Sequence, residues 1–259
     1  MLILSAFLVS AAFEPIGIWF LAIFGYALFF KYLAKSERPV RFAFIFGLIV
    51  NGIVLHWTSK YVGALPWILL TLLQAAFYIP VGWIYRKTGS LLSVVCAFLL
   101  FEEVRARFPF GGFGWNRLSF SQADSPYIIA AAYFGDSVLA FFGISLGIAL
   151  YLLCARAQLF SVAIISAITT VAILLPVPVI GQGSVNVLAV QGNVPKLGSD
   201  FNSRAQEVFN YHLKQTDIAL RAIQSKPDVI IWPENAVDVD PFINSDIADE
   251  LTRIVDTYK

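Results

Sequence analysis

The chain has 259 residues, of which 58% are hydrophobic and 14% are charged, and its mean hydropathy is +0.74. This hydrophobic share exceeds the roughly 45–50% of a soluble domain and argues against a chain that is soluble throughout. Residues 1–183 hold 11 Lys/Arg and 6 Asp/Glu, whereas residues 184–259 hold 7 and 11. We therefore predict a transmembrane domain over residues 1–183 and the start of a different domain over residues 184–259. Basic residues form no long run, so we expect no nucleic-acid partner.

Seven apolar stretches in the first domain predict membrane-spanning helices, because about 20 apolar residues cross a bilayer as a helix. The expected spans are residues 2–13, 16–33, 41–59, 64–85, 89–106, 126–153 and 158–176. The first stretch is short, and no basic residue precedes it. We expect it to be a partial span or a shortened N-terminus rather than a cleaved signal peptide.

The basic residues of the short loops predict the orientation of these spans. Seven fall on one side of the membrane: Lys31, Lys35, Arg38, Arg41, Arg86, Lys87 and Arg156. The other side has four: Lys60, Arg105, Arg107 and Arg117. We therefore expect a multi-pass protein of the plasma membrane, with a cytoplasmic N-terminus and with residues 184–259 outside the cytoplasm.

A loop rich in glycine and aromatic residues, residues 108–122, joins the fifth and sixth expected spans. Its Gly-Gly-Phe-Gly stretch lacks the Lys-Ser/Thr pair that completes a phosphate-binding loop. Aromatic side chains favour the lipid headgroup level of a membrane. The sequence therefore predicts a loop that lies at the membrane surface.

The second domain begins with the pattern of a strand–helix–strand unit. Residues 185–191 and 229–232 are β-rich, and Ser203 and Gln206 have the spacing of a capping box that opens a helix between them. His212 is expected to lie on a solvated amphipathic helix, without metal partners. A further helix is predicted over residues 247–258. Two strands cannot bury a stable sheet alone, so we expect the sheet to need further elements.

The second strand runs into the segment Trp232-Pro233-Glu234-Asn235. Proline keeps the residue before it extended and cannot continue the strand ladder. Glu234 is therefore expected just beyond the carboxyl end of a buried strand, where open α/β sheets carry their chemistry. By itself this pattern favours an ordinary surface acid at the end of a strand.

Taken together, these motifs resemble the apolipoprotein N-acyltransferase family of bacteria. The similarity lies in the early Phe13-Glu14-Pro15, the loop from Phe108 to Gln122, the segment Val187-Leu-Ala-Val-Gln-Gly-Asn-Val-Pro195 and the Trp-Pro-Glu-Asn turn. Asn235 and the Gly-Asn-Val-Pro segment are similar to the actinobacterial branch. The resemblance covers the whole chain but only about the first half of a usual family member.

The resemblance implies a polytopic α-helical membrane domain of about seven spans, followed by the beginning of a nitrilase-like αββα sandwich. It also implies a Glu–Lys–Cys triad that moves an acyl chain from a phospholipid to the diacylglyceryl cysteine of a lipoprotein, without a cofactor or a metal. Glu234 matches the general base, and the Lys and Cys would lie beyond residue 259. Cys96 lies inside the fifth expected span and Cys154 at the cytoplasmic end of the sixth, and both are expected to be small, unpaired packing residues.

The resemblance also implies that the loop segment meets membrane lipids, and two interpretations of it stay open. It is either an entrance for acyl chains or a surface anchor; its residues are Phe110, Gly111, Gly112, Phe113, Gly114 and Trp115. Two alternatives to an active acyltransferase also stay open. One is an inactive truncated homologue or a subunit that needs a partner, and the other is a non-enzymatic membrane protein.

Overall fold

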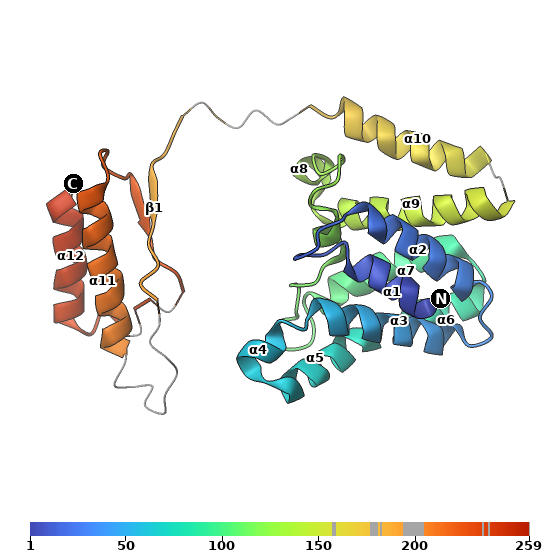
Figure 1. The fold of residues 1–259 in the computed structure, drawn as a ribbon, viewed down its shortest axis with the longest axis horizontal. Coiled ribbons are helices and arrows are strands. Elements are labelled where there is room, and N and C mark those ends of the chain that lie inside the picture. The colour runs from blue at the N-terminus through green and yellow to red at the C-terminus, as the bar shows by residue number, and fades with distance from the viewer. Residues whose placement is uncertain are drawn as a thin grey trace. The chain divides into compact units, whose positions relative to one another are not determined.

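The computed structural model describes residues 1–156, 159–176, 181, 183–193, 205–234, 236–237 and 239–258. The chain divides into two compact units, Met1–Pro178 and Val179–Lys259. Within the described ranges the first unit is helical, and the second combines two strands with two helices (Figure 1).

The first unit contains short and long apolar helices in close succession. Their bounds are α1 (Leu2–Ser10), α2 (Phe20–Leu33), α3 (Pro39–Val54), α4 (Thr58–Val62), α5 (Ala64–Ala76), α6 (Ile79–Thr88), α7 (Leu91–Arg105), the 3-10 helix η1 (Leu118–Gln122), α8 (Ala130–Phe134), α9 (Ser137–Arg156) and α10 (Leu159–Leu174). Aromatic side chains fill the core between α2, α3 and α7, where Phe29 packs against Phe46 and Phe98 with ring centroids 4.5 and 5.5 Å apart. Such pairs add to the energy of apolar burial.

Glycines let the helix backbones of this unit approach closely. A Cβ atom on Gly25 of α2 would lie 2.6 Å from Val9 Cγ2 of α1, and one on Gly147 of α9 would lie 2.5 Å from Tyr26 Cβ of α2. Small residues at helix crossings are typical of membrane helices, which associate through packing rather than through the hydrophobic effect.

Two of the described helical stretches are long and apolar enough to cross a bilayer: Ala64–Thr88, which comprises α5 and α6, and Ser137–Ala155. The expected spans have other bounds in the structure, and two of them illustrate the differences. The stretch 41–59 ends as helix α3 at Val54, and α4 follows separately. The stretch 126–153 starts with turns and the short α8, which ends at Gly135 with φ +79°, so the long helix begins only at Ser137. A left-handed glycine at this point interrupts the helix.

The second unit begins with the strand–helix–strand arrangement that the sequence predicts. Strand β1 (Val187–Ala189) pairs in parallel with β2 (Val229–Ile231), with Leu188 opposite Ile230. Helix α11 (Ala205–Ala222) connects them, and α12 (Ser245–Tyr258) follows. Figure 1 shows both helices on the same side of the two strands. The buried residues of this unit's core are Phe209, Leu213, Leu220, Ile247 and Ile254.

Only one face of the β1–β2 sheet is covered within the described residues. Leu188 and Ile230 are half-buried and pack against the helix core. On the opposite face Val187 and Ile231 remain 53% and 51% exposed. Parallel strands normally have both faces covered. This arrangement agrees with the expectation that two strands cannot complete the sheet.

Candidate functional site

Glu234 lies three residues beyond the end of β2, in a turn that is closed by a backbone hydrogen bond. The strand ends at Ile231, and the amide of Ala236 donates a hydrogen bond of 3.2 Å to the carbonyl oxygen of Pro233. Ala236 is buried beneath the turn, whereas the Glu234 side chain is exposed. The turn thus presents one carboxylate at the carboxyl end of a parallel strand. Asn235 lies outside the described residues.

Trp232 anchors this turn to helix α11. Its indole Nε1–H donates to Thr216 Oγ1 at 3.0 Å, and its ring lies 5.8 Å from the ring of Phe209. The Thr216 hydroxyl donates in turn to the carbonyl oxygen of His212 at 2.7 Å. Because both a hydrogen bond and ring packing hold Trp232, they also fix the position at which the turn of Pro233 and Glu234 begins.

His212 lies on the amphipathic helix α11, as predicted, but it is buried there, with only 2% of its surface exposed, instead of in contact with solvent. Its ring packs against Trp232 at 5.6 Å, and a Cβ atom on Gly192 would lie 2.6 Å from its Nδ1 atom. Nδ1 lies 2.8 Å from the carbonyl oxygen of Val208, whereas Nε2 has no hydrogen-bond partner within the described part of the chain. His212 therefore fills the space between the residues that follow the two strands.

The aromatic loop of the first unit projects several side chains from the protein surface. Phe110 and Trp115 are 101% and 71% exposed. Trp115 packs against Trp57, which follows α3, with ring centroids 5.8 Å apart, and Trp57 packs against Tyr61 of α4. Exposed apolar patches of this kind mark binding or membrane surfaces. Tryptophan and tyrosine are the residues that membranes concentrate at the headgroup level.

The loop turns back on helix α7 at Gly112. The amide of Phe113 donates to the carbonyl oxygen of Arg105 at 2.9 Å. Gly112 has φ +84°, and a Cβ atom there would lie 2.1 Å from the carbonyl carbon of Ala106. Only glycine fits both this backbone conformation and this close approach.

A buried polar network, which the sequence analysis missed, holds the base of the loop. Arg105 is 4% exposed and donates to Gln74 Oε1 of α5 at 2.9 Å and to the carbonyl oxygen of Asn116 at 2.8 Å. Asn116 also donates through its side chain to Asn51 of α3. The Arg105 guanidinium thus connects α5, α7 and the loop, and the Asn116 side chain extends the network to α3. Such a planar fork of donors suits arginine and not lysine.

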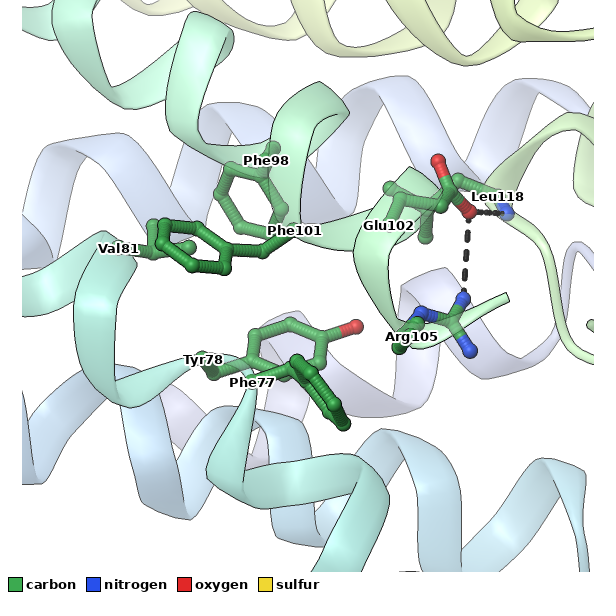
Figure 2. Close-up of a pocket in the computed structure, with 8 residues that line it drawn as sticks. All are labelled: Phe77, Tyr78, Val81, Phe98, Phe101, Glu102, Arg105 and Leu118. Carbon is green, nitrogen blue, oxygen red and sulfur yellow. Dashed lines mark hydrogen bonds and ion pairs between the residues drawn. The ribbon is translucent and has the colours of Figure 1, made fainter. Parts of the chain in front are cut away.

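Glu102 completes this network from one helical turn before Arg105. It is 5% exposed, lies 3.2 Å from the Arg105 guanidinium and accepts a hydrogen bond from the backbone amide of Leu118 (Figure 2). The side chains of Tyr78 and Phe77 from the α5–α6 junction line a cavity of about 10 Å³ beside this pair. A cavity of this size holds at most one water molecule. The network therefore supports the loop and does not form a substrate pocket.

A second, partly exposed network lies on the neighbouring face. Arg117 pairs with Glu103 and, at 2.6 Å, with Asp136, and the Ser137 hydroxyl donates to Glu103 at 2.6 Å. Burial lowers the pKa of Arg117, but its hydrogen bond to Glu103 and the charge of Asp136 outweigh this effect and raise it overall. Arg117 therefore remains a cation that ties the loop to the start of α9.

The predicted site residues lie in different units of the chain. Glu234 belongs to the unit Val179–Lys259, and residues 110–115 belong to the unit Met1–Pro178. Pro195 and Ser203 of the sequence motifs lie outside the described residues. Cys96 and Cys154 are free, as predicted, and both are exposed. Within the described ranges no three His, Cys, Asp or Glu side chains gather as a metal site requires.

Comparison with known proteins identifies the family. Residues 5–149 match the model of the apolipoprotein N-acyltransferase N-terminal domain. The chain is 32% identical to the apolipoprotein N-acyltransferase of Mycolicibacterium smegmatis over 93% of its own length and 46% of the relative. It is 28% identical to the protein of the same name from Allorhizobium ampelinum, over 64% of the chain and 32% of that relative.

The matched residues 5–149 include the exposed aromatic loop and the buried polar network that holds the base of this loop. The chain belongs to the apolipoprotein N-acyltransferase family. It spans about half the length of the M. smegmatis relative and about a third of that from A. ampelinum.

Proposed function

We propose that this chain forms the N-terminal half of an enzyme that transfers a fatty acyl chain from a phospholipid to the N-terminal S-diacylglyceryl cysteine of apolipoproteins. Family membership supports the reaction class. The observation that carries the proposal is the exposed Glu234 carboxylate, presented by an anchored turn at the carboxyl end of β2. A base in this position is available to a nucleophile that approaches from another segment.

In this proposal Glu234 acts as the general base of a Glu–Lys–Cys triad whose Lys and Cys lie outside these 259 residues. Glu234 takes the proton of the cysteine thiol, and the thiolate attacks the ester carbonyl of the phospholipid. The lysine cation stabilises the oxyanion that develops, and Glu234 returns the proton to the oxygen of the lysophospholipid, which leaves as an alcohol. The α-amine of the lipoprotein cysteine then attacks the thioester, which forms the amide and restores the thiol.

We also propose that the first unit lies in the plasma membrane as about seven spans, with a cytoplasmic N-terminus. The domain boundary would fall at residues 183/184, and residues 184–259 would begin an extracytoplasmic nitrilase-like domain. Two stretches with the length and apolarity of spans support this placement, together with the glycine contacts between helices. In this arrangement residues 110–115 lie among the lipid headgroups and admit acyl chains, and the exposed rings of Phe110 and Trp115 support that role.

A second candidate function is that of an inactive homologue, or of a subunit that a partner completes. The uncovered apolar face of the sheet, formed by Val187 and Ile231 among others, favours this alternative. Such a subunit would bind its partner through this face, because burial of an apolar sheet face favours association.

An acyl-transfer assay distinguishes these functions. Membranes that contain the full-length enzyme would be supplied with labelled phospholipid and a diacylglyceryl peptide, and the N-acylated peptide would be measured by mass spectrometry. We expect Glu234→Gln to lower the rate about 10²–10⁴-fold, the usual contribution of a general base. Glu207→Gln, which changes another exposed glutamate of the same unit, should retain the full rate. Comparable rates for wild type and Glu234→Gln would refute the proposed role, and activity of the 259-residue chain alone would refute the need for the missing triad residues.

A further inference from the structure

A hollow with a volume of about 420 Å³ lies where the first turn of α3 meets the last turn of α6. Three arginines, Arg38, Arg41 and Arg86, line it together with the single carboxylate of Glu37. Phe44 and Ile79 supply part of its apolar wall. The hollow therefore combines cationic and apolar groups.

The backbone contact between α3 and α6 brings the three arginines together. A Cβ atom on Gly82 would lie 2.5 Å from the carbonyl oxygen of Pro39 and 2.6 Å from Val40 Cα, so the two helices touch at this point. Arg86 comes four residues after Gly82 and lies on the same face of α6. It therefore lies beside Arg38 and Arg41, which flank Pro39.

Glu37 balances only part of the positive charge of this hollow, because three arginines face one carboxylate. Within the described residues, none of the ion pairs involves Arg38, Arg41 or Arg86. Guanidinium groups that share one hollow repel one another, and a bound anion removes that cost. The first backbone amides of α3 add positive potential, since no side chain caps this helix end. Arginine forks match phosphate oxygens in particular.

The position of the hollow points to a lipid rather than to a soluble anion. Arg86 lies near the end of the apolar stretch Ala64–Thr88, and Arg38 immediately precedes the apolar helix α3. The start of α3 and the end of α6 therefore lie at the headgroup level if the two helices cross a bilayer. Trp57 and the aromatic loop adjoin the other end of α3, which has 16 residues and is therefore about 24 Å long. The hollow is thus separate from the proposed entrance for acyl chains.

We propose that this hollow binds the phosphate group of an anionic phospholipid, with Arg38, Arg41 and Arg86 as its ligands and Phe44 and Ile79 against the apolar part of the lipid. Basic pockets between membrane helices bind such headgroups. In the proposed topology this lipid belongs to the cytoplasmic leaflet. The inference rests on the membrane placement of α3 and α6 and is independent of the chemistry of Glu234.

Native mass spectrometry of the full-length protein, released from nanodiscs of phosphatidylcholine with increasing phosphatidylglycerol, tests this site. We expect one retained phosphatidylglycerol per chain, and a roughly five- to tenfold weaker apparent affinity for each of the variants Arg38→Gln, Arg41→Gln and Arg86→Gln. Arg41→Lys keeps the charge but loses the fork, so it should weaken binding less than Arg41→Gln. The double variant Lys35→Gln/Lys87→Gln removes nearby charges that do not line the hollow, and it should bind as the wild type does.

Three results would overturn the proposal. The first is equal retention of phosphatidylcholine and phosphatidylglycerol by the wild type. The second is unchanged phosphatidylglycerol affinity in the triple arginine-to-glutamine variant, with its helical circular dichroism intact. The third is displacement of the lipid by millimolar inorganic phosphate, which would identify a site for free phosphate instead. Acyl-transfer activity serves as a separate readout, because loss of the lipid site leaves Glu234 unchanged.

Discussion

Replacement of Arg105 by Met tests whether the buried network supports the aromatic loop. Arg105 donates to Gln74, to Asn116 through two acceptors, and to Glu102. Without it, the Glu102 carboxylate stays buried with the Leu118 amide as its remaining donor within the described residues. Breaking a buried ion pair from one side costs about 3–5 kcal/mol. We therefore expect Arg105→Met to lower the free energy of unfolding by this amount, measured by circular dichroism in detergent micelles.

Two comparisons make this prediction specific. Arg107 lies two residues away, is 71% exposed and pairs with Glu103, so Arg107→Met should cost no more than about 1 kcal/mol. The double variant Glu102→Leu/Arg105→Met removes both buried charges and should be more stable than Arg105→Met alone. Equal stability of Arg105→Met and Arg107→Met, or a double variant no better than the single one, would refute the network's role.

Two further substitutions test the loop and the turn. Gly112→Ala should destabilise the protein by more than Gly111→Ala in thermal unfolding, because both positions have a positive φ but only the Cβ at Gly112 meets backbone atoms; equal losses would contradict the close approach. Thr216→Val should cost about 1–3 kcal/mol in chemical unfolding, since it leaves the Trp232 indole N–H without its acceptor. Thr252→Val changes an exposed threonine and should cost less than about 0.5 kcal/mol; a similar loss in both would contradict the anchoring of Trp232.

The sequence predicts elements whose patterns are local. The strand–helix–strand unit follows from the β-rich stretches at residues 185–191 and 229–232, and the structure pairs residues 187–189 and 229–231 of these stretches in parallel. The helices of the first unit follow from apolar length, although Gly135 shifts the start of α9. Helix ends depend on single backbone conformations, which hydropathy does not report.

Hydropathy does not predict that charged residues are buried, because a hydropathy pattern places every charged residue near a span end in solvent. Arg105 is buried through contacts with Gln74 and Asn116, and Asn116 in turn donates to Asn51; these residues come from distant parts of the chain. Two signals were present: the i, i+3 spacing of Glu102 and Arg105, and the amides Asn51 and Gln74 inside apolar stretches. A polar residue within an apolar helix indicates that a hydrogen-bonding partner lies nearby, because a buried polar group must be hydrogen-bonded.

The same limit applies to the second unit. His212 was expected in solvent because its own helix is amphipathic, yet Trp232 and Gly192 bury it from outside the helix. The position of Glu234 beyond β2 follows from the strand and proline pattern alone, and its catalytic role remains a proposal.

Mass measurement of the intact full-length enzyme after a single turnover with phospholipid, without any acceptor peptide, tests the catalytic role of Glu234 most directly. The proposal predicts that the wild type gains the mass of one acyl chain through a thioester and that Glu234→Gln gains it at least 100-fold more slowly. Glu207→Gln should gain it at the wild-type rate. Acylation of Glu234→Gln at the wild-type rate would show that another group removes the thiol proton.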